Sequence, residues 1–480
     1  MCSQRSRKRR IQQTARYVPI IAIIACMALG CNFPVEILDL IAGSTSPSTQ
    51  IPTIVPDATA SPTAIPSPTA TSDIPSPDAS PTLQALPPGV LSRMQTIEAQ
   101  VMELRGLYPN APTRRRLLTE DEMQRVVIDE ITEGYTSEDA ADDARVMALF
   151  GFLEPGFDLW TLYLDLYSEQ VLGFYDDDTE DMTVLSDADF DILAQFTYAH
   201  EYDHFLQDHT FDFKDDLHYD DTSCEANGDR CLAVQALFEG DAVLLQTQWL
   251  RTYASQDEIA ELLEITSSIE SPVFSTAPEF IQQSMVFPYN QGLEFVLYFH
   301  LKGQWAAVDD VYHNPPASTE QILHPENYPD DVPVILEVPD LAAELGPDWR
   351  QMDRDILGEW QLKMMLSEYL PGDVAGNAAK GWGGDMYIAF HNDDLDRSAL
   401  ILIAAWDTDQ DATQYYEAMR DYGDARFTDY TASGLQLVWQ TETYYASLMR
   451  GGNQTQWILA PDEATETALR SAFTFPVLQQ

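Results

Sequence analysis

The segment from residue 43 to residue 88 limits where this chain can build a core. It is rich in Ser, Thr, Pro and Ala, as in SPSTQIPTIVPDATASPTAIPSPT, and it has no periodic pattern of apolar residues. A segment of this composition cannot bury enough apolar surface to offset the entropy lost on folding. We therefore expect a disordered tether here, and a folded core built from the residues that follow it.

The residues before the tether have the pattern of a targeting segment. Arg and Lys cluster between residues 5 and 16, and residues 18–30 are apolar but short for a bilayer span. This stretch ends in Ala28-Leu29-Gly30-Cys31, which resembles a bacterial lipoprotein signal, although Ala28 stands where Leu is usual. The resemblance implies a signal peptide at 1–30 and a membrane anchor through lipidated Cys31. An ordinary cleaved signal and an uncleaved anchor are the alternatives, and all three place the chain outside the cytoplasm.

The chain has five cysteines, and their positions agree with export. Cys2 and Cys26 would be removed with the signal, and Cys31 would carry the lipid. The remaining pair, Cys224 and Cys231, predicts a local disulfide in an oxidising compartment. A zinc site at this pair is the weaker interpretation, because no second Cys or His pair follows at finger spacing.

The charge of the chain excludes one class of partner. Acidic residues number 78 against 26 basic ones, which gives a net charge of −52. A surface this negative repels phosphate backbones, so we expect no nucleic-acid binding. Solubility outside the cell or tolerance of salt accounts for the charge, and selection for cationic substrates is the alternative.

Apolar periodicity after residue 90 predicts helices joined by one short hairpin. The hairpin is GFYDDDTEDMTVL, and Ser186 or Asp187 can cap a helix that runs to about His209. The other expected helices before residue 303 lie at about 91–105, 119–134, 157–170, 229–253 and 290–302.

The pattern changes after about residue 366 to short β-runs such as ALILIAAW and TQWILA, with helices around 409–420 and 461–472. We expect an α+β fold overall. The predicted segments are a signal peptide at 1–30, the tether at 31–88, a mainly helical domain with a small β-hairpin or sheet at 89–365, and a smaller α+β domain at 366–480.

The sequence His200-Glu201-Tyr202-Asp203-His204 lies within one of the predicted helices. His200 and His204, four residues apart, project from the same helix face and can bind one zinc ion. Glu201 cannot join them on that face, but it can act as the general base on a water at the metal. Chance matches to HExxH occur in solvated helices, so the motif needs support from its context.

A later helix offers a third metal ligand within ALFEGDA. Glu239 lies on the apolar stripe of that helix, where an unpaired carboxylate would be costly and a metal would resolve the problem. Asp241 points about 200° away around the helix, so the two acids cannot bind the same ion. We favour Glu239 as the ligand. We expect Asp241 to be either solvated or in contact with a metal-binding side chain rather than with the metal itself.

These motifs resemble the gluzincin branch of zinc metallopeptidases, which pairs HExxH with a Glu on a later helix. The chain is more similar still to exported bacterial metallopeptidase-like proteins, through YAHEYDHFLQDHTFDF, ALFEGDA, FPYNQGLEFV, PPASTEQILHPENY and GWGGDMY. The resemblance implies a zincin-like fold for 89–365 and one zinc ion per chain, held by His200, His204 and Glu239. It implies hydrolysis of peptide or protein substrates with Glu201 as the base.

Two parts of such a site stay open in the sequence. Many gluzincins place an acid four residues after the Glu ligand to orient the first histidine, and Val243 stands at that position here. The group that stabilises the oxyanion is also not identified. Tyr289, His324 and Tyr328 are candidates, and their alternative role is structural.

The alternative to an enzyme is a non-catalytic membrane-anchored lipoprotein that uses a degenerate metallopeptidase fold for binding. A non-catalytic relative usually loses at least one of the residues needed for catalysis. The presence of all four, His200, Glu201, His204 and Glu239, therefore favours the enzyme.

Overall fold

The structure is a computed structural model. It describes residues 86–186, 190–336, 338–339, 341–428, 430–434 and 436–473. The expected signal peptide, Cys31 and the tether up to residue 85 lie outside the described residues. Within the described ranges, no helix combines the length and apolar character needed to cross a membrane.

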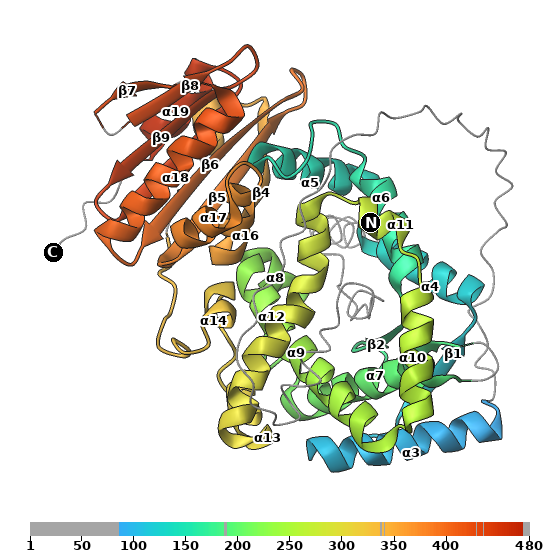
Figure 1. The fold of residues 1–480 in the computed structure, drawn as a ribbon. Helices are drawn as coiled ribbons and strands as arrows, with labels where there is room; N and C mark the ends of the chain where they lie inside the picture. The colour runs from blue at the N-terminus through green and yellow to red at the C-terminus, as the bar shows by residue number, and fades with distance from the viewer. Residues whose placement is uncertain are drawn as a thin grey trace, which may run out of the picture.

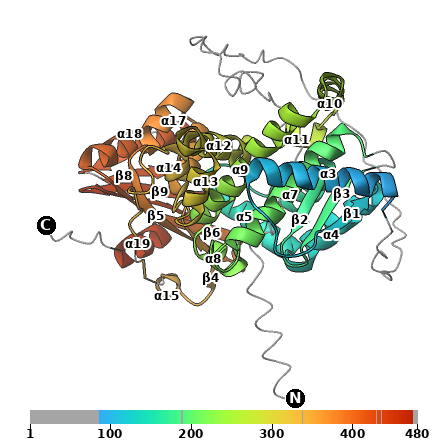
Figure 2. The ribbon, with the colours of Figure 1, turned by 90° about the horizontal axis from the view of Figure 1, so that it is seen from below.

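The part of the chain before residue 349 is mainly helical, and α12 lies near the middle of the molecule in both views (Figures 1 and 2). Its helices are α3 (Pro88–Arg105), α4 (Glu120–Gly134), α5 (Ser137–Phe150), α6 (Leu159–Gln170), α7 (Ile192–Phe211), α8 (Asp221–Ala226), α9 (Gly228–Tyr253), α10 (Gln256–Ser268), α11 (Pro272–Thr276), α12 (Glu279–Gly303), α13 (Trp305–Tyr312), α14 (Thr319–Leu323) and α15 (Ala342–Leu345).

A small sheet lies against α7 in this helical part. The expected hairpin is confirmed as β2 (Gly173–Asp176) and β3 (Asp181–Leu185), which pair antiparallel. A third strand, β1 (Arg114–Leu118), pairs with β3 in parallel, so the order is β1-β3-β2 and β2 lies at one edge. Its sequence RRRLL has no apolar alternation, which is why the sequence did not predict it.

Helix α7 begins later than the sequence suggested. The expectation that Ser186 or Asp187 caps it is wrong, because the helix starts at Ile192 and Asp191 accepts a hydrogen bond from the backbone N–H of Ala194. This is the usual N-cap arrangement, one turn further along the chain. The later start leaves His200 and His204 in the middle of the helix, where neighbouring elements can bury them.

Helices α9 and α12 pack closely because two glycines face each other. A Cβ atom on Gly240 would lie 2.1 Å from the backbone carbon of Gly292, and one on Gly292 would lie 2.0 Å from the carbonyl oxygen of Ala236. Helix α12 starts eleven residues before the predicted 290–302, and Pro288 lies inside it. A proline in a helix removes one backbone hydrogen bond, and this misled the prediction.

The expected disulfide is confirmed at the start of α9. Cys224 in α8 is bonded to Cys231 in α9, with their Cα atoms 5.3 Å apart. The bond links the end of the loop after α7 to the helix that carries Glu239.

The rest of the chain forms a seven-stranded antiparallel sheet with helices on both faces. Its strands, in the order β4-β5-β6-β10-β9-β8-β7, are β4 (Trp349–Asp355), β5 (Trp382–Asn392), β6 (Arg397–Trp406), β10 (Gln454–Ala460), β9 (Tyr445–Gly451), β8 (Gln436–Gln440) and β7 (Thr431–Ser433). Its helices are α16 (Gly358–Ser367), α17 (Gly372–Ala379), α18 (Asp409–Phe427) and α19 (Glu463–Ala472).

Figure 2 shows α17 and α18 on one face of this sheet and α19 on the other. The buried side chains of β6 alternate between them: Leu400 and Leu402 belong to the main core, whereas Ile401 and Ile403 pack with Leu469 of α19. Coverage of both faces explains why ALILIAAW is apolar throughout. The α+β class expected from the sequence is confirmed.

Candidate metal centre

Several polar side chains of α7 lie in the interior of the helical part. His200, Glu201, Asp203 and His204 are all fully buried, and so is Glu239 on the neighbouring helix α9. Burial of a polar group without partners is costly, so each of these side chains requires an explanation.

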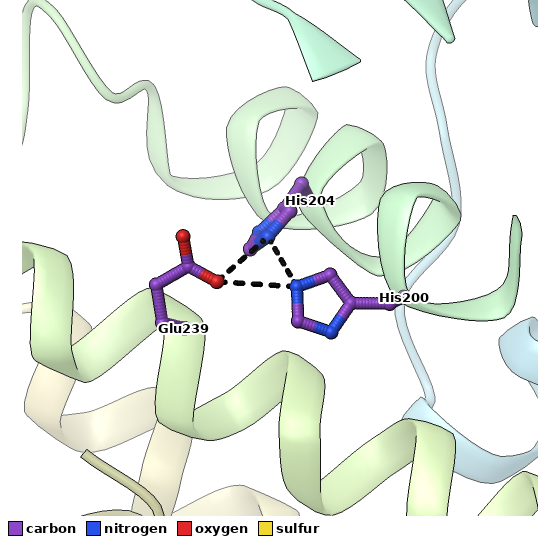
Figure 3. Close-up of side chains that lie close together, drawn as sticks. All are labelled: His200, His204 and Glu239. Atoms are coloured by element: carbon purple, nitrogen blue, oxygen red, sulfur yellow. Dashed lines mark hydrogen bonds and ion pairs between the residues drawn. The ribbon is translucent and has the colours of Figure 1, made fainter. Parts of the chain in front are cut away.

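The two histidines and Glu239 point toward one another (Figure 3). The Nε2 atoms of His200 and His204 are 2.9 Å apart. Oε2 of Glu239 lies 3.1 Å from Nε2 of His200 and 3.3 Å from Nε2 of His204. The three side chains can hold a metal ion, because each offers one donor atom to the same point.

The electrostatics of this cluster follow from burial and from its single carboxylate. Burial lowers the pKa of His200 to about 4. Burial also acts to lower the pKa of His204, but the Glu239 carboxylate outweighs it and raises this pKa to about 9. The pKa of Glu239 falls to about 2, because His204 and His200 outweigh the opposing effect of burial. Without a cation, one proton on His204 therefore neutralises Glu239, and a metal ion would take its place.

Glu201 lies beside the cluster and is not one of its three converging groups. Both of its carboxylate oxygens are buried without a hydrogen-bond partner among the described residues. Burial raises the pKa of Glu201 well above its usual range, and His204 and the nearby backbone N–H of Tyr175 in β2 act in the opposite sense. A buried carboxyl group with a raised pKa next to a metal-binding set is suited to proton transfer.

The edge strand β2 passes close to Glu201. A Cβ atom on Gly173 would lie 3.5 Å from Cγ of Glu201 and 2.8 Å from Cγ2 of Thr197. Glycine at this position therefore allows β2 to lie close to α7 at Thr197, one turn before Glu201.

The three candidate electrophiles lie in different surroundings. Tyr289 in α12 contacts the cluster, where its hydroxyl group donates a hydrogen bond to Oε1 of Glu239 at 3.2 Å. Burial raises the pKa of Tyr289 well above its usual range, so this hydroxyl group stays protonated. His324 instead contacts Glu359 in α16, and Tyr328 donates to the carbonyl oxygen of Asn314. These contacts match the structural alternative for His324 and Tyr328.

Two glutamines that the sequence analysis missed face the outer nitrogens of the histidines. Oε1 of Gln207 lies 3.0 Å from Nδ1 of His204. Gln246 is close enough to His200 to raise its pKa, although Nδ1 of His200 and Oε1 of Gln246 both lack a hydrogen bond within the described part of the chain. Gln246 follows Glu239 by seven residues, two helical turns along the same face, and this spacing is the signal that could have identified it.

Asp241 is neither solvated nor a ligand, so the solvated interpretation is wrong. Its carboxylate is fully buried and accepts hydrogen bonds from Nε and Nη2 of Arg105, the latter at 2.8 Å. The hydroxyl group of Tyr312 donates a further bond at 2.9 Å. This ion pair and the Tyr312 hydrogen bond join α3, α9 and α13 next to the candidate metal cluster.

Asp203 lies between the ion pair of Asp241 and Arg105 on one side and Gln207, which faces His204, on the other. Nε2 of Gln207 donates a hydrogen bond to Oδ2 of Asp203 at 2.9 Å, which fixes the carboxamide that faces His204. Burial raises the pKa of Asp203, and the neighbouring Asp241 carboxylate adds to the rise, whereas Arg105 opposes it. The arrangement holds the orienting group of His204 in a single position.

Comparison with known proteins gives one partial match. Neither the curated proteins nor the solved structures contain a match to this chain. Residues 347–470 match a family described as Domain of unknown function (DUF8575). The matched segment begins just before β4 and ends within α19, so it contains the seven-stranded sheet and lies outside the candidate metal centre.

Proposed function

We propose that this protein is a zinc metallopeptidase that uses His200, His204 and Glu239 as metal ligands and Glu201 as its general base. One observation carries the proposal: three donor atoms converge within 3.3 Å of one another beside a buried carboxylate that has no hydrogen-bond partner among the described residues. A structural cluster of this kind would be expected to satisfy Glu201 as well.

The donor set favours zinc over other common ions. Two imidazole nitrogens and one carboxylate oxygen are typical ligands of catalytic zinc, whereas magnesium and calcium prefer oxygen alone. In a tetrahedral zinc site with bonds of about 2.0–2.1 Å, neighbouring ligand atoms lie about 3.3 Å apart. The distances of 2.9–3.3 Å in the cluster agree with that spacing.

A zinc ion bound there would supply Lewis acidity, which makes a water molecule more acidic and polarises a peptide carbonyl group. The chain's own residues supply the rest. Glu201 takes the proton of the attacking water and passes it to the nitrogen of the leaving amine. Its burial raises the pKa of the carboxyl group, which makes Glu201 a stronger base for the first transfer.

Two further features support a peptide as the substrate. Strand β2 is an edge of its sheet and lies next to Glu201, so an extended peptide can pair with it through backbone hydrogen bonds. The hydroxyl group of Tyr289 lies in the same cluster and can donate a hydrogen bond to the oxyanion of the tetrahedral intermediate.

We also propose that the enzyme works outside the cytoplasm, anchored to the membrane by a lipid on Cys31. The proposal rests on the lipoprotein-like sequence at residues 28–31 and on the disulfide between Cys224 and Cys231. In a lipoprotein-processing host, Cys31→Ser should leave the precursor unprocessed or release the protein from the membrane fraction. Unchanged processing and lipid labelling of this variant would exclude the anchor.

The test of the enzyme proposal separates metal binding from catalysis. Glu201→Gln should keep about one zinc per chain and lower peptide hydrolysis by about 10²–10⁴-fold, because it removes the base and keeps the shape. Glu239→Gln should lower zinc affinity itself, because a neutral amide replaces an anionic ligand. Metal content is measured by elemental analysis, and hydrolysis with a library of quenched fluorescent peptides.

Glu261→Gln, on the exposed surface of α10, is the matched control and should change neither quantity. Loss of zinc in Glu201→Gln, or wild-type turnover by that variant, would show that the assigned roles are wrong. A zinc-loaded wild type that cleaves no peptide would favour the alternative of a binding protein.

A further inference from the structure

A second cluster of acidic side chains lies where the helical part meets the large sheet. A cavity of about 530 Å³ opens between α14, the loop that follows it and the turn from β6 into α18. Its lining includes the acids Glu320, Asp331, Asp407 and Asp411, and the bases His324 and Lys380. Three of these residues come from PPASTEQILHPENY and the loop after it, a motif that the candidate metal centre does not use.

Three carboxylates converge in this cavity. One oxygen each of Glu320, Asp331 and Asp407 lies within 4.8 Å of the other two. Glu320 belongs to α14, Asp331 to the loop after it, and Asp407 to the turn between β6 and α18. The cluster therefore brings together the two halves of the chain.

Glu320 gives the second, independent indication of a ligand. Its side chain belongs to a residue only 3% exposed, and its Oε2 atom is buried without a hydrogen-bond partner among the described residues. A buried carboxylate that has an unpaired oxygen and lies beside two other carboxylates is destabilising unless a proton or a cation neutralises it. Asp407 is exposed, so an ion can enter from solvent.

We propose that Glu320, Asp331 and Asp407 bind a calcium ion that joins α14 to the large sheet. Oxygen donors alone are the preference of calcium, and one oxygen from each of the three carboxylates lies within 4.8 Å of the other two, close enough to bind the same ion. Magnesium also takes oxygen ligands, but it requires a regular octahedron and usually keeps several waters, so carboxylates from three separate segments suit calcium better. The site is separate from the proposed zinc ligands and uses none of them.

The basic groups in the cavity do not already neutralise the cluster. His324 is paired with Glu359 at 3.0 Å, so its charge is directed away from the three carboxylates. Lys380 also lines the cavity, and Asp411 at the other side adds a further negative charge. The acids outnumber the remaining base, which leaves a net negative site.

The backbone around the cluster is held in place without the ion. Nε2 of Gln321 donates a hydrogen bond to the carbonyl oxygen of Asp331 at 2.6 Å. The backbone N–H of Asp407 donates to the carbonyl oxygen of Gly381 at 3.0 Å. A site that is partly organised in advance loses less entropy when the ion binds. With three protein carboxylates and water as the remaining ligands, we expect a Kd of about 10⁻⁴–10⁻³ M, as in extracellular calcium modules.

The experiment measures the effect of calcium alone on the thermal unfolding of the purified full chain, after treatment with a chelator. Calcium at 10 mM should raise the Tm of the wild type by several degrees, and 10 mM magnesium should raise it less. Glu320→Gln and Asp407→Asn should each lose most of the rise. Calorimetric titration should give one calcium per chain for the wild type and no measurable binding for Glu320→Gln.

Two controls keep the outcomes distinct. Asp394→Asn, in the exposed turn between β5 and β6, should keep the full calcium effect. His204→Ala should also keep it, so a failure of the zinc proposal would not affect this one. Glu320→Gln should be at least as stable as the wild type in the chelator, because it removes a buried charge that lacks a partner. An absent calcium effect in the wild type, or an equal effect in Glu320→Gln, would overturn the proposal.

Discussion

Oε1 of Gln207 lies 3.0 Å from Nδ1 of His204, one turn further along the same helix. The carboxamide of Gln207 is fixed in turn, because its Nε2 atom donates to Asp203 and to the carbonyl oxygen of Phe238. The oxygen that faces His204 is therefore an acceptor, which requires Nδ1 to carry the hydrogen and leaves Nε2 free for a metal.

The first prediction tests this orienting role. Gln207→Ala should lower zinc affinity by about 10–100-fold, the usual effect of losing a residue that orients a metal-binding histidine. Affinity is measured by competition with a chromophoric chelator. Gln283→Ala, on the exposed surface of α12, should leave affinity unchanged. Gln207→Glu keeps an acceptor and should retain more affinity than Gln207→Ala, an order that a purely structural role would not produce.

The core of the candidate site could be predicted from the sequence, because helical spacing alone brings His200 and His204 to one face. Glu239 could be predicted because an acid on an apolar stripe requires a partner. The buried ion pair of Asp241 could not be predicted, because its partner Arg105 lies 136 residues away in the chain. Gln207 and Gln246 were missed because an uncharged amide does not require a charged partner, so only the helical spacing from the ligands marks them in the sequence.

The fold shows the same division between local and long-range information. Long helices such as α9 and the hairpin of β2 and β3 were predicted from local periodicity. Strand β1 and the strand β4 are held by pairing with distant strands, and their sequences RRRLL and WRQMDRD have no apolar alternation. Such strands form because a partner is available, and a single sequence does not reveal that partner.

The second prediction concerns the contact between α9 and α12. Gly292→Ala should destabilise the protein by about 1–3 kcal/mol or more, because the added methyl group would overlap the backbone of α9. The separated helices should also displace Glu239 and Tyr289, so zinc affinity should fall with stability. Both are measured by denaturant unfolding and by chelator competition.

The control substitution, Gly89→Ala, should change the free energy of unfolding in the opposite direction. Gly89 lies in the first turn of α3, and no atom lies within 4 Å of the position that an added methyl group would take. Gly89→Ala should therefore stabilise the protein by about 0.5–1 kcal/mol. If Gly292→Ala also stabilises the protein, α9 and α12 do not pack as closely as described above.

The third prediction concerns the disulfide between Cys224 and Cys231. Replacing both cysteines with alanine should lower the free energy of unfolding by about 2–3 kcal/mol, the loop-entropy value for a bond between residues seven apart. The loss should concentrate at the start of α9, which hydrogen exchange can detect. Alkylation of native, unreduced protein should label neither cysteine, and labelling of both would refute the bond.

The last prediction concerns the ion pair between Asp142 of α5 and Arg350 of β4, which joins the helical part to the large sheet. The two side chains form two hydrogen bonds, at 2.6 and 2.8 Å. Burial acts to raise the pKa of Asp142, but Arg350 and the neighbouring Arg145 together outweigh it, and the net shift is downward from the usual 3.8. A lowered pKa in the folded state stabilises the protein above pH 3.8, and this stabilisation disappears as the pH falls through the folded-state value. Because the Arg350 side chain is 39% exposed, water screens the pair and we expect only about 1 kcal/mol.

Asp142→Asn should therefore lower the free energy of unfolding by about 1 kcal/mol at pH 7, and the difference from the wild type should shrink toward zero near pH 3. Urea unfolding at pH 7, 5 and 3 measures both effects, with Asp394→Asn as an exposed control. The same difference should also decrease in 1 M salt, because screening weakens a partly exposed pair. A difference that stays constant from pH 7 to pH 3 would mean that Asp142 acts through packing, since a packing effect does not depend on its ionisation.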